Sequence, residues 1–147
     1  METELIHRLQ EQQRALRLAK QARRADGVPP GLVGLLAELD RLSGQECHVK
    51  ELAAHTYLDP STVSRAVAHL VTLGFVARTP DPEDRRASVL SVTPKGRAAI
   101  AEMHDWYGTV AAEALESWTP MELDDFTRML ARFSRDMTTY LSKEEAR

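Results

Sequence analysis

The 147-residue sequence contains a single cysteine, no long apolar run and no excess of positive charge. One cysteine excludes an internal disulfide framework and suits a reducing compartment. Without a run of about 18 apolar residues, no segment is a candidate for a transmembrane helix. The first residues, METELIHRLQEQQ, are too polar for a secretory signal. These absences predict a cytoplasmic protein without a membrane partner.

The sequence also lacks the motifs of an enzyme or a metal site. The five histidines show no metal-ligand spacing, and the Cys47-His48 pair has no companion ligand nearby. There is no glycine-rich phosphate loop and no nucleophile motif. We therefore expect no catalytic residue, no bound metal and no cofactor. Because the acidic Glu46 disfavours a thiolate at Cys47, we expect an inert, structural cysteine, although the sequence leaves a redox role open.

The most informative stretch, residues 48–93, begins with two short predicted helices. Residues 50–55 favour the first helix. Asp59 as N-cap, with a proline at the first helical position, predicts a second helix over 60–73. Gly74 supplies the left-handed residue that ends it. The stretch therefore starts with a helix-turn-helix.

After Gly74 the pattern changes to that of β-strands. The β-prone runs 75–79 and 88–92 are separated by a charged, turn-rich loop, PDPEDRR, which should lie in solvent. A hairpin behind two helices makes a winged helix-turn-helix, whose second helix enters the major groove of DNA and whose wing reaches the backbone or the minor groove. The expected fold is therefore mainly α with a small β-wing.

The predicted second helix has two different faces. One face is apolar and is typical of packing on a core: Val63, Ala66, Val67 and Leu70. The exposed side carries small or hydroxyl side chains, one arginine and one histidine: Ser61, Thr62, Ser64, Arg65 and His69. Small residues permit close approach to DNA, hydroxyls bond phosphates or base edges, and an arginine can bond a guanine through two donors. An ordinary surface helix would more usually pair Lys with Glu, and such pairs are absent.

These segments resemble the MarR family of bacterial transcription regulators over essentially the whole chain. The resemblance rests on Glu51-Leu52-Ala53, Ser61-Thr62-Val63-Ser64-Arg65, Leu73-Gly74-Phe75-Val76, Asp81-Pro82-Glu83-Asp84-Arg85-Arg86 and Val92-Thr93-Pro94-Lys95-Gly96. It implies one domain over 1–147, a homodimer, and a palindromic operator of double-stranded DNA. It also implies a repressor that a small-molecule effector or an oxidant often relieves, although the sequence identifies neither effector nor operator.

The resemblance also implies roles for single residues. Asp84 and Arg86 match the family's wing pair, in which the acid orients an arginine that enters the minor groove, and Arg85 would lie beside the phosphates. The recognition-helix positions fall on Ser61, Thr62, Ser64 and Arg65. His48 departs from the family pattern, because relatives commonly have Thr or Ser there to cap the first helix.

The net charge of −3 is unevenly distributed along the chain. Residues 1–47 carry seven basic and seven acidic side chains, 48–97 carry seven and five, and 98–147 carry five and ten. The predicted DNA-binding part is therefore the only segment with a net positive charge. Its excess of two charges is small, so tight binding to DNA should need two copies.

The helices outside 48–93 are expected to supply the interface with a second copy. Three of these helices are predicted, at 4–24, 30–42 and 94–118. The helix at 30–42 is the exception, because it is expected to pack under the DNA-binding lobe. A capping box at Thr119 then begins a last helix, whose apolar residues follow the alternating steps of three and four that suit helix pairing. The predicted dimer interface is Leu5, Leu9, Phe126, Leu130, Phe133, Met137 and Tyr140. Folding back onto the chain's own helices is the alternative, but a two-fold dimer would bury the surplus apolar surface.

Two further alternatives remain open. A winged-helix lobe can serve as a protein-interaction module without specific DNA binding, and the salt dependence of DNA binding would separate the two functions. His104 lies where the family's effector pocket tends to form, but a partly buried, hydrogen-bonded histidine is the simpler interpretation.

Overall fold

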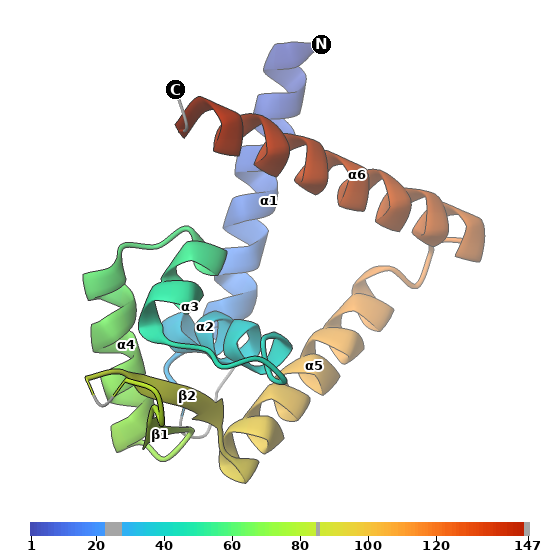
Figure 1. The fold of residues 1–147 in the computed structure, drawn as a ribbon. Coiled ribbons are helices and arrows are strands. Elements are labelled where there is room, and N and C mark those ends of the chain that lie inside the picture. The colour runs from blue at the N-terminus through green and yellow to red at the C-terminus, as the bar shows by residue number, and fades with distance from the viewer. Residues whose placement is uncertain (23–27, 85, 146–147) are drawn as a thin grey trace. The chain divides into compact units, whose positions relative to one another are not determined.

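The computed structural model describes residues 1–22, 28–84 and 86–145. Within these ranges the chain forms helices and one two-stranded antiparallel sheet (Figure 1). The elements are, in order, α1 (Glu2–Ala22), α2 (Pro30–Arg41), α3 (Val49–Thr56), α4 (Pro60–Thr72), β1 (Val76–Pro80), β2 (Ser88–Val92), α5 (Pro94–Ala114) and α6 (Pro120–Glu145). Contacts divide the chain into a first unit, Met1–Trp106, and a second unit, Tyr107–Arg147. The predicted mainly α fold with a small β-wing is confirmed.

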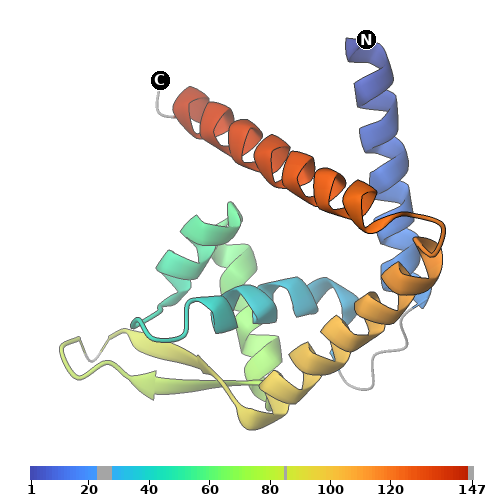
Figure 2. The same ribbon diagram turned by 90° about the vertical axis from the view of Figure 1, so that its right-hand side faces the viewer.

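The core of the first unit lies among α2, α3, α4 and the hairpin. Leu36 of α2, Leu52 of α3 and Val63 of α4 are fully buried, and Phe75 before β1 is nearly so. Figure 2 shows α2 crossing α4 beside the hairpin. Full burial of such a side chain contributes roughly 1.5–3 kcal/mol. The prediction that residues 30–42 pack under the winged-helix lobe is therefore confirmed.

Helix α4 begins and ends at the residues that cap it. Oδ1 of Asp59 accepts hydrogen bonds from the backbone N–H groups of Ser61 (2.8 Å) and Thr62 (3.2 Å). At the other end, Gly74 has the positive φ of 81° that favours glycine. The helix runs one residue short of the predicted end, because Leu73 forms the C-cap.

The hairpin pairs Val76 with Val92 at one end and Pro80 with Ser88 at the other. The first strand begins one residue later than predicted. Phe75 does not complete the next pair of the ladder, because its N–H donates to Leu70 O (2.9 Å), although its carbonyl still accepts from the N–H of Thr93 opposite it (3.0 Å). These bonds tie the end of α4 to the start of α5.

Helix α5 begins directly against the end of α4. The Thr93 hydroxyl accepts from Gly96 N–H (3.1 Å) and donates to Gly74 O (2.7 Å). A Cβ at Gly96 would lie 2.3 Å from Phe75 O, so only glycine fits this approach. The junction between α4 and α5 is therefore closely packed.

The later helices differ from prediction at one boundary. Helix α5 ends at Ala114 rather than at 118, and a tight turn follows in which Trp118 N–H donates to Leu115 O (2.9 Å). The prediction was wrong because Trp118 packs edge-on against Phe126 of α6, with ring centroids 5.4 Å apart. The predicted capping box is confirmed, since Thr119 N–H donates to Oε2 of Glu122 (2.7 Å).

Helix α1 begins two residues before its predicted start, and the predicted final residues, Arg23 and Arg24, lie outside the described residues. Among the residues that the structure describes, no helix combines the length and apolarity that crossing a bilayer requires.

Candidate nucleic-acid interface

Helix α4, the predicted recognition helix, presents the two predicted faces. Val63, Val67 and Leu70 are at most 1% exposed and pack in the core. The polar residues named from the sequence are all exposed: Ser61, Thr62, Ser64, Arg65 and His69. Because the apolar face fixes the rotation of the helix, these five side chains are held toward solvent. The helix can therefore offer hydroxyl groups and one guanidinium to a ligand.

Ser61 has a second role, in the cap of α4, that was not predicted from the sequence. Its hydroxyl and its backbone N–H both donate to Oδ1 of Asp59. The Ser61 hydroxyl is the main cause that lowers the pKa of Asp59 below its ordinary value. Ser61 is therefore part of the helix cap as well as of the exposed face.

The loop at the wing tip is closed by its own aspartates. Oδ1 of Asp84 accepts from the backbone N–H of Arg86 (2.9 Å), and Oδ1 of Asp81 accepts from that of Glu83 (2.8 Å). The acid of the wing pair thus holds the backbone of Arg86, whose side chain is exposed. Arg85 lies outside the described residues. These two bonds are Asx-type turns that shape the described part of the loop, in which the Arg86 side chain is open to solvent.

A contact between α3 and the wing was missed by the sequence analysis. Nε2 of His48 lies 2.8 Å from Oδ2 of Asp81, and Nδ1 lies 3.2 Å from Oε2 of Glu51. Glu51 also accepts the backbone N–H of His48 (3.0 Å), so α3 begins at Val49 with His48 as N-cap. The only indication of this contact in the sequence was His48 itself, because histidine is not one of the usual residues at a helix N-cap.

The hydrogen bond between His48 and Asp81 favours the charged form of each side chain. The hydrogen bond to Asp81 raises the pKa of His48 above its ordinary value. The pKa of Asp81 is lowered, first by the Glu83 N–H and then by His48. Only 7% of Asp81 is exposed, which is unusual for a carboxylate and is explained by these partners. His48 and Asp81 are therefore hydrogen-bonded between the start of α3 and the wing, and the raised pKa of the imidazole favours its charged form in this pair.

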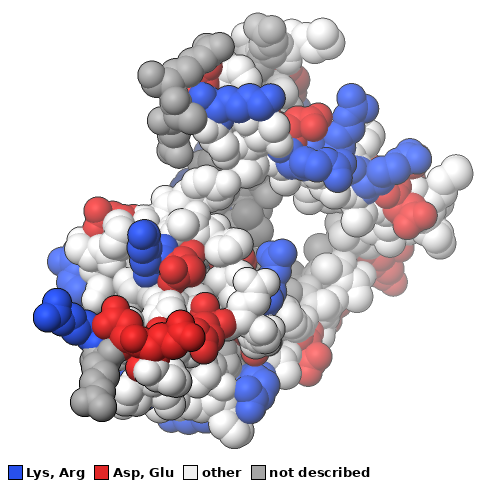
Figure 3. Space-filling model, viewed as in Figure 1, with Lys and Arg blue, Asp and Glu red and all other residues white. Residues whose placement is uncertain are grey.

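The charge on this part of the molecule is mixed. In Figure 3, acidic side chains of the first unit gather over the region between the start of α3 and the hairpin, with basic side chains to either side. A hollow of about 260 Å³ between α3 and the wing is lined in part by Lys50, Arg78 and Arg86. Basic side chains of the wing and of α3 thus line this hollow, close to the acidic side chains of the same region.

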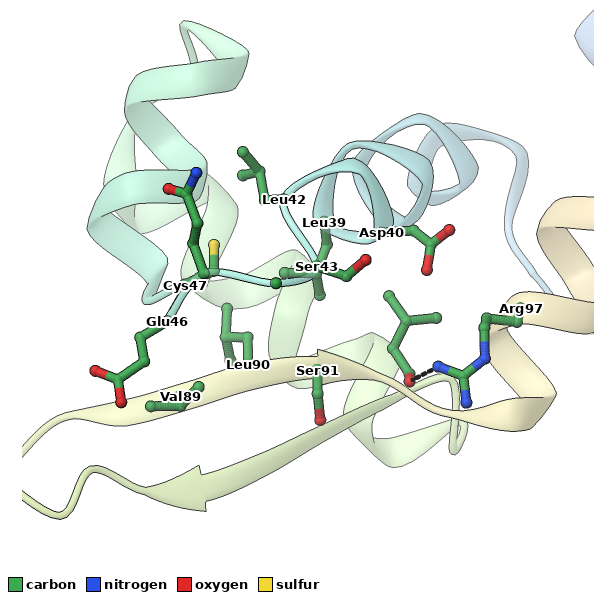
Figure 4. A pocket seen from close by; sticks show the side chains of 13 residues that line it. Leu39, Asp40, Leu42, Ser43, Glu46, Cys47, Val89, Leu90, Ser91 and Arg97 are labelled. Atoms are coloured by element: carbon green, nitrogen blue, oxygen red, sulfur yellow. Dashed lines mark hydrogen bonds between the residues drawn. The ribbon is translucent and has the colours of Figure 1, made fainter.

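A larger hollow of about 360 Å³ lies at the end of α2, beside β2 and the start of α5. Figure 4 shows Glu46 at one end and Arg97 at the other, where Arg97 donates to Val92 O (2.8 Å). Cys47, which lines this hollow, is buried, and burial, followed by the charge of Glu51, raises the pKa of its thiol. The raised pKa favours the unreactive thiol, as predicted, but the main acidic neighbour is Glu51 rather than Glu46.

Two other findings concern possible ligand groups. His104 is exposed, so the expectation of a partly buried histidine is wrong for the single chain. Across residues 1–22, 28–84 and 86–145, no three or more His, Cys, Asp or Glu side chains are grouped so that they could hold a metal ion.

Comparison with known proteins agrees with this geometry. A model described as "MarR family" matches residues 26–87. The uncharacterized HTH-type transcriptional regulator YxaD of Bacillus subtilis is 29% identical over 122 residues, which cover 83% of this chain and 84% of YxaD. The uncharacterized HTH-type transcriptional regulator ML2140 of Mycobacterium leprae is 30% identical over 96 residues, covering 62% of this chain and 67% of ML2140.

Solved structures show the same fold. FabT of Streptococcus pneumoniae, solved in complex with DNA, superposes with a TM-score of 0.77 at 12% identity, over 95% of this chain and 99% of FabT. BpsR of Bordetella bronchiseptica gives a TM-score of 0.69 at 24% identity, over 89% of this chain and 98% of BpsR. The predictions of a DNA-binding fold and of a non-enzyme are confirmed, and the chain belongs to the MarR family of winged-helix transcription regulators.

Proposed function

We propose that this regulator binds a dyad-symmetric DNA duplex as a homodimer, with α4 of each copy in the major groove. The observation that carries the proposal is the exposed polar face of α4, opposite a fully buried apolar face. In that orientation the base-reading residues are Ser61, Thr62, Ser64 and Arg65, and His69 faces a phosphate. The fold shared with FabT, which was solved with DNA, supports this use of the helix.

The wing supplies the second contact of each copy. Arg86 enters the minor groove, Arg85 lies beside the phosphates, and Asp84 holds the loop that carries them. The bond from Arg86 N–H to Asp84 supports this arrangement, because it fixes the backbone at the base of the arginine. A narrow minor groove attracts a guanidinium through its enhanced negative potential.

The homodimer accounts for the apolar surface that the single chain exposes. Leu5 is 50% exposed, and on α6 the exposed fractions are 47% for Phe126, 41% for Leu130, 44% for Met137 and 63% for Tyr140. Leu9 and Phe133 are half-buried. Contiguous apolar surface on a folded protein usually marks an interaction site. Pairing of these helices in two copies would place the recognition helices about 34 Å apart, one turn of DNA.

We further propose that the dimer acts in the cytoplasm as a repressor that a small ligand relieves. BpsR, a structural neighbour, is described as regulated in its DNA binding by 6-hydroxynicotinic acid. A ligand that favours one spacing of the two recognition helices needs a coupling of about 1–3 kcal/mol to act as a switch.

Salt titration of DNA binding tests the proposal. The logarithm of the affinity should fall linearly with the logarithm of the salt concentration, because bound cations are released from the phosphates. Arg86→Ala should weaken binding on every duplex and should reduce the slope by about one for each copy. Arg132→Ala, a change of an exposed arginine on α6, serves as the control. Binding to no duplex at any salt concentration would instead indicate a protein-interaction module.

A further inference from the structure

His48 occupies a position that favours its protonated form. One ring nitrogen lies 2.8 Å from a carboxylate oxygen of Asp81 and the other lies 3.2 Å from one of Glu51. A neutral imidazole can donate from only one nitrogen, whereas an imidazolium donates from both. Both contacts are therefore satisfied together only when the ring is charged.

Asp81 connects this ring to the wing loop. The Asp81 oxygen that does not face His48 accepts from Glu83 N–H (2.8 Å), and the Asp81 N–H donates to Ala87 O (3.1 Å). Ala87 N–H in turn donates to Asp84 O (3.0 Å). Asp81, which is nearly buried, thus bonds to both ends of the loop that carries Arg86. His48 in turn bonds to Asp81.

From this geometry we propose that protonated His48 is a positioning residue for the wing, tying the loop that presents Arg86 to the start of α3. The role rests on the proposed function, because the loop matters through its contact with DNA. His48 need not touch DNA itself. Its effect on affinity arises from the order that it gives the wing before binding.

The surrounding charges set the pH range of this contact. Charged groups beside the ring come from α3, from β1 and from the wing loop: Lys50, Glu51, Arg78, Asp81 and Arg86. The two carboxylates make the direct contacts and raise the pKa of His48, led by the hydrogen bond to Asp81, whereas burial of the ring acts in the opposite direction. The preceding Cys47 adds no charge, because burial raises the pKa of its thiol.

The sign of the pH dependence follows from these shifts. Since the pKa of His48 is raised in the folded chain, its contribution is complete below the ordinary histidine value and is lost as the pH rises through the raised pKa. The lowered pKa of Asp81 means that its contribution is lost only in acid, as the pH falls through that lowered value. The wing should therefore be held between these limits and should loosen on the alkaline side.

A test without DNA uses nuclear magnetic resonance on the full chain. Asp81→Asn keeps an oxygen for Glu83 N–H but removes the charge, so the midpoint of His48 titration should move to lower pH. His48→Thr keeps a capping side chain but cannot reach Asp81, so protection of the 81 and 87 amides from exchange should fall by about fivefold at mildly acidic pH. His104→Gln, which changes an exposed histidine of α5, should leave both readouts unchanged.

A second test measures DNA affinity on a selected duplex from about pH 6 to about pH 8. The wild-type affinity should fall by about fivefold as the pH rises, whereas His48→Thr should already be weak at the acidic end and should lose less affinity over the same range. His104→Gln should follow the wild type. The inference is overturned if His48→Thr follows the wild-type pH profile, or if Asp81→Asn leaves the His48 midpoint in place. If the wild type binds no duplex, the proposed function fails, and the exchange data still decide whether His48 holds the wing.

Discussion

In the proposed complex with DNA, we expect sequence discrimination to depend most on Arg65. It is exposed beside the hydroxyl groups of α4, and its guanidinium can bond the two acceptors of a guanine. Arg65→Ala should weaken binding to the selected operator by about 1–3 kcal/mol and binding to random DNA much less. Competition titration of the two duplexes measures the difference. Equal losses on both duplexes would assign Arg65 to the phosphates instead.

Among the glycines that the structure describes, Gly96 leaves the least room for a side chain. Gly96→Ala would place a Cβ 2.3 Å from the carbonyl oxygen of Phe75, so the start of α5 would have to move away from the end of α4. We expect a loss of about 1–3 kcal/mol in the free energy of unfolding, measured with urea.

Gly108, on the same helix, provides the matched control for this prediction. A Cβ there meets no atom within 4 Å. Gly108→Ala should therefore be neutral or should stabilise the chain by up to about 1 kcal/mol, because alanine favours the helix. A loss for Gly108→Ala as large as that for Gly96→Ala would mean that the close approach to Phe75 O does not cause the loss at Gly96.

Single residues were predictable from the sequence where their partners are near in the chain. The Asp59 cap and the left-handed Gly74 are local patterns, and both are confirmed. The bond between His48 and Asp81 joins residues 33 positions apart, so no local pattern could identify it. The same holds for Gly96, since nothing in its neighbours shows that the Phe75 carbonyl lies against it.

Among the elements, α6 has the most exposed apolar surface, and we expect it to pair with a second copy. Phe126→Ala combined with Leu130→Ala should shift the protein from dimer to monomer, because full burial of each side chain is worth roughly 1.5–3 kcal/mol. Sedimentation velocity measures the mass. Arg128→Ala, which changes an exposed polar position of the same helix, should leave the dimer intact. An unchanged mass for the double variant would remove this face from the interface.

The elements themselves were predictable because caps and turns mark their ends. Helix α4 agrees with prediction within one residue, since a proline follows its N-cap and a glycine follows its C-cap. The end of α5 was not predictable in the same way. Its helical pattern continues to Trp118, but the packing of Trp118 on Phe126 replaces the last helical turn.

At the scale of the whole molecule, the segment with a net positive charge was predictable from the sequence. The charged side chains that lie beside it in the folded chain were not. Counting charges by segment assigned a net excess to residues 48–97. The folded first unit adds an acidic region between α3 and the hairpin, which the count could not reveal (Figure 3). We therefore expect a DNA duplex to be contacted through the arginines of the wing and Arg65, and we expect tight binding to need the phosphate contacts of two copies.

The most direct test of this account is selection of duplexes by the full chain from a random library, followed by the mass of the complex. We predict enrichment of an inverted repeat whose half-sites are centred about one helical turn apart, roughly 34 Å, bound by two copies. Enrichment of no sequence, or of an asymmetric site bound by one copy, would contradict the account.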